Sequence, residues 1–111
     1  MDKITKYRKI ILKVFEDYAK EGYANIQAES EIVSDEKNDR YQLVTIGWEG
    51  FKRIHACTFH FDIKNGKIWI QNDETDYGVV NDLLEMGVPK SDIVLAYQSP
   101  SMREELGFAI N

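Results

Sequence analysis

The dipeptide Asn65-Gly66 is the feature of the sequence that most constrains the fold. Both residue types tolerate the positive φ angles of a two-residue type I′ turn, which joins adjacent antiparallel strands. The segments on either side of it, residues 51–63 and 67–72, alternate apolar and polar residues as half-buried strands do. The sequence therefore predicts a β-hairpin that turns at residues 65–66.

Pairing counted outward from this turn gives the two faces of the hairpin different characters. Residues opposite one another share a face, and successive residues alternate between faces. The first face is apolar and belongs in a core: Phe59, Phe61, Ile63, Ile68 and Ile70. The second face is polar around one tryptophan, with His60 opposite Gln71, and comprises Thr58, His60, Asp62, Trp69, Gln71 and Asp73.

Helices and further strands are expected around this hairpin. An apolar period of 3.6 residues predicts a helix over residues 3–21, capped by Asp2 and closed by Gly22. Further elements are strands at 24–33 and 40–48, turns at 34–39 and at Glu49-Gly50, a helix from Asp73 or Thr75 to Gly87, a helical turn at 89–92, a strand rather than a helix at 93–97, a helix at 99–106 with Pro100 first, and an edge strand at 108–110.

These elements predict an α+β fold: an N-terminal helix followed by a four-stranded antiparallel meander, then helices and short C-terminal strands packed on the sheet. A length of 111 residues is that of one domain, 1–111. The single cysteine, Cys57, excludes an intrachain disulfide, and the sequence has neither a membrane-spanning run nor a signal peptide. We therefore expect a cytoplasmic protein without membrane contact.

The net charge of -5 is unevenly distributed along the chain. Residues 1–20 carry six basic and three acidic side chains, a net of +3, whereas residues 21–111 carry eight basic and sixteen acidic ones, a net of -8. Most of such a surface repels DNA, because binding to DNA depends on neutralising phosphates. Direct DNA contact would be confined to the basic side of the first helix, at Lys6, Lys9 and Lys13, so we expect DNA to be involved at most indirectly.

The polar face of the hairpin has some of the groups of a metal or nuclease site. His60, Asp62 and Asp73 supply one nitrogen and two oxygen donors, but His55 is expected on the opposite face, which removes a second imidazole. The neighbouring strand has no lysine in position to activate water. Cys57 is expected to point inward on the apolar face, where a thiol is inert. We therefore predict no catalytic, metal-binding or cofactor-binding residue and no cofactor.

Two tryptophans favour a recognition surface. Trp69 lies amid polar groups and Trp48 at a strand end, and exposed aromatic side chains in such settings are typical of protein interfaces. Cover by one of the chain's own helices is the alternative for Trp69.

The register between the second and third strands decides which side chains share the polar face with His60. The Glu49-Gly50 turn puts Leu43 on the same face as His60, unless a β-bulge near Cys57 reverses the alternation. Either the sheet is covered on both faces, or an apolar patch on that face is buried by another chain.

Several stretches are distinctive when they are taken together and in order. They are YQLVTIGWEG (41–50), Arg53, HFDIKNGKIWIQND (60–73), GVPKSDIVLAY (87–97), and Pro100 with Arg103 before FAI (108–110). Over nearly the whole chain they resemble the XisI family, the fdxN-element excision controlling factors of cyanobacteria. The departures are small: Asp76 stands where a glutamate is usual, and Leu106-Gly107 replace a Thr-acid pair.

The resemblance implies a role in programmed, site-specific excision of a DNA element, with the cutting and joining done by a separate recombinase. It implies a non-enzymatic accessory factor whose partner is XisH, a protein that resembles nuclease-fold proteins. We expect this chain to bind an XisH-like protein, and a homo-oligomer is a further expectation. The residues that we assign to partner binding are Trp48, His60, Asp62, Trp69, Gln71, Asp73 and Arg103.

Three other functions remain open at this point. In an antitoxin-like role, the acidic chain would mask a basic surface of the nuclease-fold partner. Direct DNA binding would use the first helix and would weaken steeply with salt. An unrecognised hydrolase or nuclease would use His60, Asp62 and Asp73.

Overall fold

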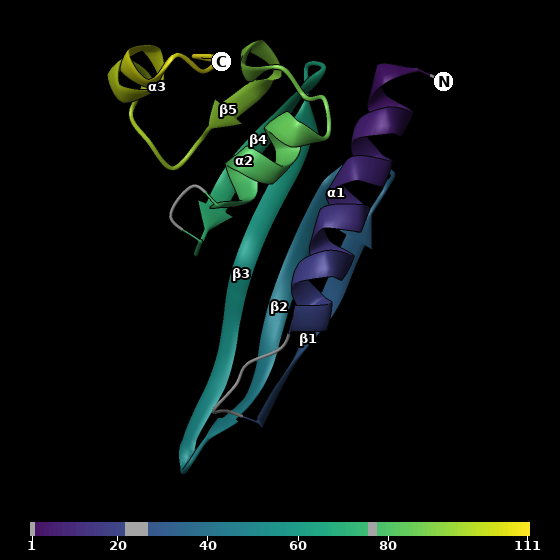
Figure 1. Ribbon diagram of the computed structural model, residues 1–111, viewed down its shortest axis with the longest axis vertical. Helices are drawn as coiled ribbons and strands as arrows, with labels where there is room; N and C mark the ends of the chain where they lie inside the picture. Colours follow the sequence, from purple (N-terminus) through teal and green to yellow (C-terminus); the bar gives the residue numbers. More distant parts are fainter. Residues whose placement is uncertain (1, 22–26, 76–77) are drawn as a thin grey trace.

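A computed structural model of the chain describes residues 2–21, 27–75 and 78–111 (Figure 1). The elements within these ranges follow in the order α1 (Lys3–Glu21), β1 (Gln27–Asp35), β2 (Arg40–Glu49), β3 (Lys52–Lys64), β4 (Lys67–Asp73), α2 (Gly78–Glu85), the 3-10 helix η1 (Lys90–Asp92), β5 (Ile93–Leu95) and α3 (Pro100–Leu106).

Helix α1 forms where the sequence predicts it. The Asp2 carboxylate accepts hydrogen bonds from the backbone N–H of Thr5 at 2.8 Å and from its hydroxyl at 3.1 Å, which caps the first turn. Gly22 and residues 24–26, where the helix was expected to close and the first strand to begin, lie outside the described residues. The buried side of α1 comprises Tyr7, Ile10, Ile11, Val14 and Phe15.

The strands form one sheet in the order β1-β2-β3-β4-β5. Strands β1 to β4 are the predicted antiparallel meander, and β5 extends it in parallel beside β4. The strand predicted at 93–97 is confirmed as Ile93–Leu95. The edge strand predicted at 108–110 is wrong. Beyond Gly107 the described chain makes one backbone bond to β5, from Ala109 N–H to the Ile93 carbonyl at 3.0 Å, and one bond does not make a ladder.

The predicted turn of the central hairpin is confirmed. At Asn65 and Gly66 φ is 55° and 76°, and Lys64 pairs with Lys67. These angles are those of a type I′ turn, whose twist matches that of the strands it joins. The register near the turn is therefore the one counted from the sequence.

The turn between β2 and β3 lies one residue later than predicted. Glu49 pairs with Lys52, so the two turn residues are Gly50 and Phe51. Gly50 takes a φ of 61°, as the first position of a type II′ turn requires, and glycine adopts this angle without a steric penalty. The change moves the pairing along β3 by two residues, so Thr45 pairs with Ala56, and the same β3 side chains share a face with those of β2 near the turn.

A β-bulge in β3 brings the apolar side chains of the two strands onto one face. Val44 pairs with Cys57 and Leu43 pairs with Phe59, which leaves Thr58 as the extra residue. The bulge left open near Cys57 is therefore present. It places Leu43 on the face of Phe59, and the alternative that put Leu43 beside His60 is wrong.

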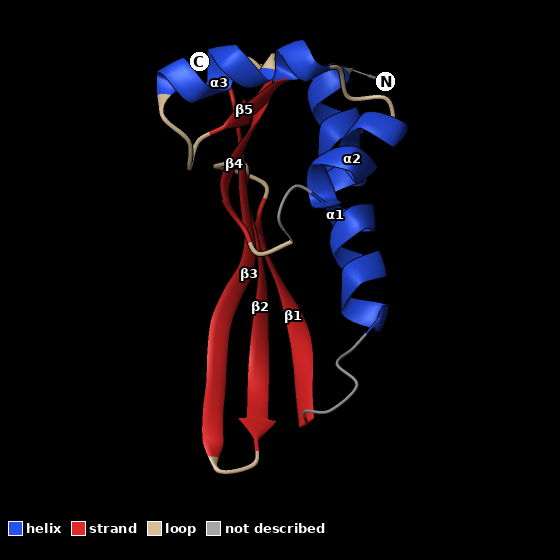
Figure 2. Ribbon diagram, turned by 60° about the vertical axis from the view of Figure 1, so that its left-hand side comes forward, coloured by secondary structure: helices blue, strands red, loops and turns tan. Residues whose placement is uncertain are grey.

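Helices α1 and α2 lie on one face of the sheet, called the covered face (Figure 2). Phe15 of α1 lies against Phe59 and Phe61 of β3, with ring centroids 5.6 Å and 5.1 Å apart. This burial of apolar area is the main source of stability in such a fold. The strand residues fully buried on this face are Tyr41, Leu43, Phe59, Phe61, Ile68, Ile70, Ile93 and Leu95.

The C-terminal part follows its predicted capping signals. The Thr75 hydroxyl accepts a hydrogen bond from Val79 N–H at 3.0 Å at the start of α2, and Gly87 closes the helix at a φ of 98°. The Ser99 hydroxyl caps α3. Leu106 and Phe108 pack against the core from α3 and the segment after it. Within the described ranges, no helix has the length and apolar character needed to cross a membrane.

Candidate partner-binding face

The face of the sheet turned away from α1 and α2, called the bare face, is the candidate site. Val33 and Trp48 on it are 51% and 47% exposed, and Val44 and Ile46 are half-buried. A sheet covered on both faces, one of the two sequence alternatives, is therefore wrong for β1 to β3. The residues that share the bare face include Glu29, Glu31 and Val33 of β1, Gln42, Val44, Ile46 and Trp48 of β2, Arg53, His55, Cys57, His60 and Asp62 of β3, Trp69 of β4, and the buried Val94 of β5.

A polar cluster lies at the end of the bare face where Asp62 pairs with Trp69. His60 Nε2 lies 3.0 Å from Asp62 Oδ1, and Gln71 Nε2 donates to Asp62 Oδ2 at 3.2 Å. The predicted pairing of His60 with Gln71 is wrong, because His60 pairs with Asn72 and Gln71 is the extra residue of a second bulge. Gln71 still reaches Asp62, so the carboxylate is held by two neighbours and presents a fixed acceptor.

Asp73 does not belong to this cluster. The bulge at Gln71 pairs Asp73 with Phe59, which takes it away from the bare face. Asp73 Oδ1 accepts hydrogen bonds from the backbone and the hydroxyl of Thr75, so it supports the turn before α2. The expectation that Asp73 lies on one face with His60 is wrong.

The two histidines share a face, contrary to expectation. The bulge at Thr58 reverses the count between them, so His55 pairs with Ile46 and His60 with Gln42 on the same side of β2. These two β2 positions are four residue steps apart, about 13 Å, which is too far for both imidazoles to bind one metal ion. Within the described ranges, no group of three or more His, Cys, Asp or Glu side chains is placed to hold a metal ion.

Trp69 is half-buried between two cations at the β4 end of the bare face. Its Nε1 donates to the Lys64 carbonyl at 3.2 Å, and Lys64 Nζ lies 4.4 Å from the ring centroid. The Arg103 guanidinium lies 6.0 Å from the same ring. These contacts and the Nε1 hydrogen bond fix the orientation of the indole, which Arg103 of α3 partly covers.

Trp48 lies at the opposite end of the bare face, where β1, β2 and β3 extend beyond α1 (Figure 2). The Arg53 guanidinium lies 5.2 Å from its ring centroid. Both side chains line a shallow hollow of 390 Å³ that also involves Glu29 and Ile46. Tryptophan and arginine are both enriched among the residues that contribute most to binding at protein interfaces.

Arg103 is occupied within the chain. Its guanidinium donates to the carbonyls of Leu95 at 3.0 Å, Ala96 at 3.2 Å and Ile110 at 2.7 Å. These bonds tie α3 and the C-terminal segment to the end of β5. Arg103 therefore has a structural task that its sequence neighbourhood does not reveal.

Cys57 faces the other way from the prediction. Because it pairs with Val44, it lies on the bare face, not inward beside Phe59. Burial and the nearby Glu74 raise the pKa of its thiol, and Sγ donates to the Phe59 carbonyl at 3.0 Å. The thiol is thus half-buried and protonated near neutral pH.

The three lysines of α1 assigned to possible DNA contact, Lys6, Lys9 and Lys13, are exposed. Lys13 pairs with Asp17 at 2.9 Å, one turn along the helix, and Lys6 and Lys9 are open to solvent. Exposed pairs of this kind contribute little to stability. Asp17 partly neutralises the charge of Lys13, which weakens the attraction of this side of α1 for an anion.

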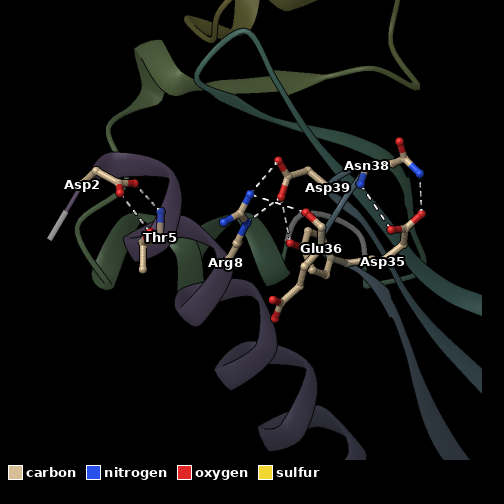
Figure 3. Close-up of polar contacts among 8 residues, drawn as sticks. Asp2, Thr5, Arg8, Asp35, Glu36, Asn38 and Asp39 are labelled. Carbon is tan, nitrogen blue, oxygen red and sulfur yellow. Dashed lines mark hydrogen bonds and ion pairs between the residues drawn. The ribbon is translucent and has the colours of Figure 1, made fainter.

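A charged cluster missed by sequence reasoning links α1 to the turn between β1 and β2 (Figure 3). Arg8 Nε donates to Asp39 Oδ1 at 2.7 Å, and the Tyr41 hydroxyl donates to the same oxygen at 2.9 Å. The hydrogen bond from Arg8 holds the pKa of Asp39 below its usual value, and burial with Asp39 nearby raises the pKa of Tyr41 to about 12. Arg8 and Asp39 are 31 positions apart in the sequence, so no local sequence pattern predicts their contact.

Comparison with known proteins agrees with this fold over the whole length. The family model described as XisI protein matches residues 1–110. No curated protein matches the chain.

Two solved structures are similar to it. The fdxN element excision controlling factor XisI from Anabaena variabilis shares 34% identity with a TM-score of 0.82, and the match covers 99% of this chain and 100% of that one. A XisI-like protein from the same organism shares 36% identity with a TM-score of 0.86, over 97% of this chain and 99% of that one. The chain therefore belongs to the XisI family.

Proposed function

We propose that this chain is a non-enzymatic factor that controls the excision of a DNA element, and that it acts by binding a nuclease-fold, XisH-like protein with its bare face. The observation that carries the proposal is the bare face itself. Apolar side chains of β1 and β2 lie there with Trp48 and without a covering helix, and Trp69 lies beside a fixed polar cluster at the β4 end, next to Arg103 of α3. The role in excision rests on the relative from Anabaena variabilis, which is described as an excision controlling factor.

The chemistry of the face suits a protein partner. Trp48 beside Arg53 offers a large, partly desolvated anchor, and Trp69 offers a second one whose orientation is fixed. Asp62, which pairs with Trp69 across β3 and β4, is held by two hydrogen bonds, so it accepts a donor from a partner without first losing side-chain freedom. Aromatic residues and arginine are enriched in protein interfaces relative to the rest of the surface.

Co-purification with the protein encoded by the neighbouring reading frame tests the proposal. We expect an XisH-like protein to bind, and the double variant Trp48→Ala with Trp69→Ala to weaken binding about a hundredfold. The double variant Lys6→Ala with Lys9→Ala on exposed α1 is the control and should bind as the wild type does.

Two results would contradict the proposal in different ways. A complex whose affinity is unchanged by the tryptophan variant would exclude the bare face as the interface. Absence of any complex, together with normal excision in cells that lack this chain, would exclude both the partner and the role.

An antitoxin-like role is a second candidate, favoured by the net charge of -8 over residues 21–111. An acidic surface masks a basic nucleic-acid-binding surface by charge complementarity. Expression of the XisH-like protein alone should then be toxic or cleave DNA, and co-expression of this chain should suppress both. A harmless partner without nuclease activity would leave excision control as the remaining function.

A further inference from the structure

The outer edge of β3 is unpaired over its first six residues. Strand β4 pairs with β3 between Phe59 and Lys64, and within the described residues no strand pairs with the outer side of 52–57. In the figure, this is the part of β3 that extends beyond the helices together with β1 and β2 (Figure 1). An unpaired edge of this length is a template for another strand.

The register decides which backbone groups point outward. Glu49 and Lys52 flank a two-residue turn and form a hydrogen-bonded pair, so the backbone groups of Lys52, Ile54 and Ala56 point toward β2. Those of Arg53 and His55 therefore point away from the sheet. Cys57 belongs to the same outward set, and its carbonyl indeed accepts from the Asn72 side chain at 2.8 Å.

The free edge has a defined end. Besides the Cys57 carbonyl, the Thr58 carbonyl is also used, by the backbone N–H of Glu74 at 3.2 Å. Between the turn at one end and these contacts at the other, Arg53 and His55 each present an N–H and a carbonyl. This is the hydrogen-bonding capacity of a short antiparallel strand.

We propose that a second copy of this chain occupies the edge, with its own β3 running antiparallel across a two-fold axis near Arg53–His55. Such an interface is self-complementary, because each copy offers the other the same backbone groups in opposite direction. The pairing joins the two bare faces into one surface. This inference concerns the chain alone and does not depend on the proposed partner.

Charge favours self-pairing at the β3 edge and opposes it at the β1 edge. Antiparallel pairing brings the basic end of β3, Lys52 and Arg53, toward Glu74 of the other copy, and symmetry repeats this contact. The outer strand β1 carries Glu29, Glu31 and Asp35 and no basic residue, so two β1 edges repel one another. The β5 edge is occupied by the segment after α3.

Apolar side chains beside the edge add to the interface. Phe51 in the turn is fully exposed, and Ile54 is half-buried. Pairing of two β3 edges places both beside the other copy, where burial of their apolar surface favours association. An exposed phenylalanine at a turn has no such stabilisation in a single copy.

Sedimentation velocity on the purified chain, over a series of concentrations, tests the inference. We expect a dimer, with His55→Pro raising its dissociation constant roughly thirtyfold, because two outward N–H donors are lost across the axis. Proline is tolerated where an edge N–H faces solvent, so the fold should be kept, as circular dichroism will show. His55→Ala retains the N–H and is the matched control, with an unchanged dissociation constant expected.

A charge exchange tests the same edge without a proline. We expect Lys52→Glu alone and Glu74→Lys alone each to weaken the dimer about tenfold, and the double variant to restore it. A wild-type chain that stays monomeric up to its solubility limit would overturn the inference. So would a folded His55→Pro variant with unchanged association, a double variant no tighter than the single ones, or open-ended assemblies in place of a dimer.

Discussion

On the covered face of β3, Phe59 and Phe61 are fully buried against Phe15, whereas on the bare face the interleaved His60 and Asp62 keep 30% and 21% of their side-chain surface exposed. Neighbouring residues of the same strand therefore lie in two environments, the core on one side and the partly exposed bare face on the other. Alternate residues point to opposite sides, so a substitution one position along acts on a different property.

The comparison separates stability from recognition. Side chains of the covered face gain free energy by leaving water, and their removal leaves a cavity. Side chains of the bare face are held by hydrogen bonds and cation–π contacts but remain accessible. We therefore expect covered-face variants to lower the free energy of unfolding and bare-face variants to change association.

The largest expected effect is the loss of a covered-face aromatic side chain. Phe61→Ala should lower the free energy of unfolding by about 3–5 kcal/mol, because it removes contacts with Phe15 and Phe59 and leaves a cavity. Trp48→Ala on the bare face should cost about 1 kcal/mol or less. Urea denaturation of the two variants compares them directly, and equal losses would break the distinction between the faces.

A smaller loss is expected where β1 approaches β2 on the covered side of the extended strands. A Cβ at Gly47 would overlap the Gln27 carbonyl oxygen and lie 2.5 Å from Ala28 Cα. Gly47→Ala should therefore cost about 3 kcal/mol, as overpacking does. Gly50→Ala is the control: its position is open but has a φ of 61°, so we expect about 1 kcal/mol. A Gly47→Ala variant as stable as wild type in thermal denaturation would exclude this close approach.

Substitution of Arg103 tests whether its hydrogen bonds hold α3 and the C-terminal segment to the end of β5, beside Trp69. Arg103→Met removes donors to three carbonyls and should cost about 2 kcal/mol in urea denaturation. Arg103→Lys keeps the charge but not the planar fork, and it should recover only a small part of the loss. Full recovery by lysine would assign the effect to charge near Trp69 instead.

The smallest expected effect is on how stability depends on pH. It comes from the cluster of Arg8, Asp39 and Tyr41, which links α1 to the sheet. The pKa of Asp39 is lower in the folded chain than its ordinary value of 3.8, so its contribution to stability is present above that pH and is lost as pH falls through the folded pKa. Asp39→Asn keeps a residue type that tolerates the φ of 52° but does not titrate. Its thermal stability should therefore fall less between pH 5 and 2 than that of the wild type, and parallel curves would contradict the assignment.

Local patterns predict most of the elements. The Asn65-Gly66 turn, the Asp2 cap of α1 and the Gly87 end of α2 each depend on a few adjacent residues, so they are legible in the sequence. The five-residue span at 93–97 is also found as a strand, although shorter. Pattern reasoning fails at 108–110, because an apolar run does not say whether a partner strand is within reach.

Faces are harder to predict than elements. The bulges at Thr58 and Gln71 each reverse the alternation, and neither of them changes the apolar pattern enough to be seen. As a result Cys57, His55 and Asp73 were assigned to the wrong faces. His60, Asp62 and Trp69 were assigned together correctly, because they lie between the hairpin turn and the first bulge.

The most direct test of the bare face uses the two tryptophans of the chain, both of which lie on it. Labelling this chain with 5-fluorotryptophan gives a fluorine NMR signal for Trp48 and another for Trp69, and an unlabelled XisH-like protein contributes none. We expect addition of the partner to shift or broaden both signals, with Trp48→Phe and Trp69→Phe assigning them. A complex that forms while both signals stay unchanged would contradict the account of the bare face as the recognition surface.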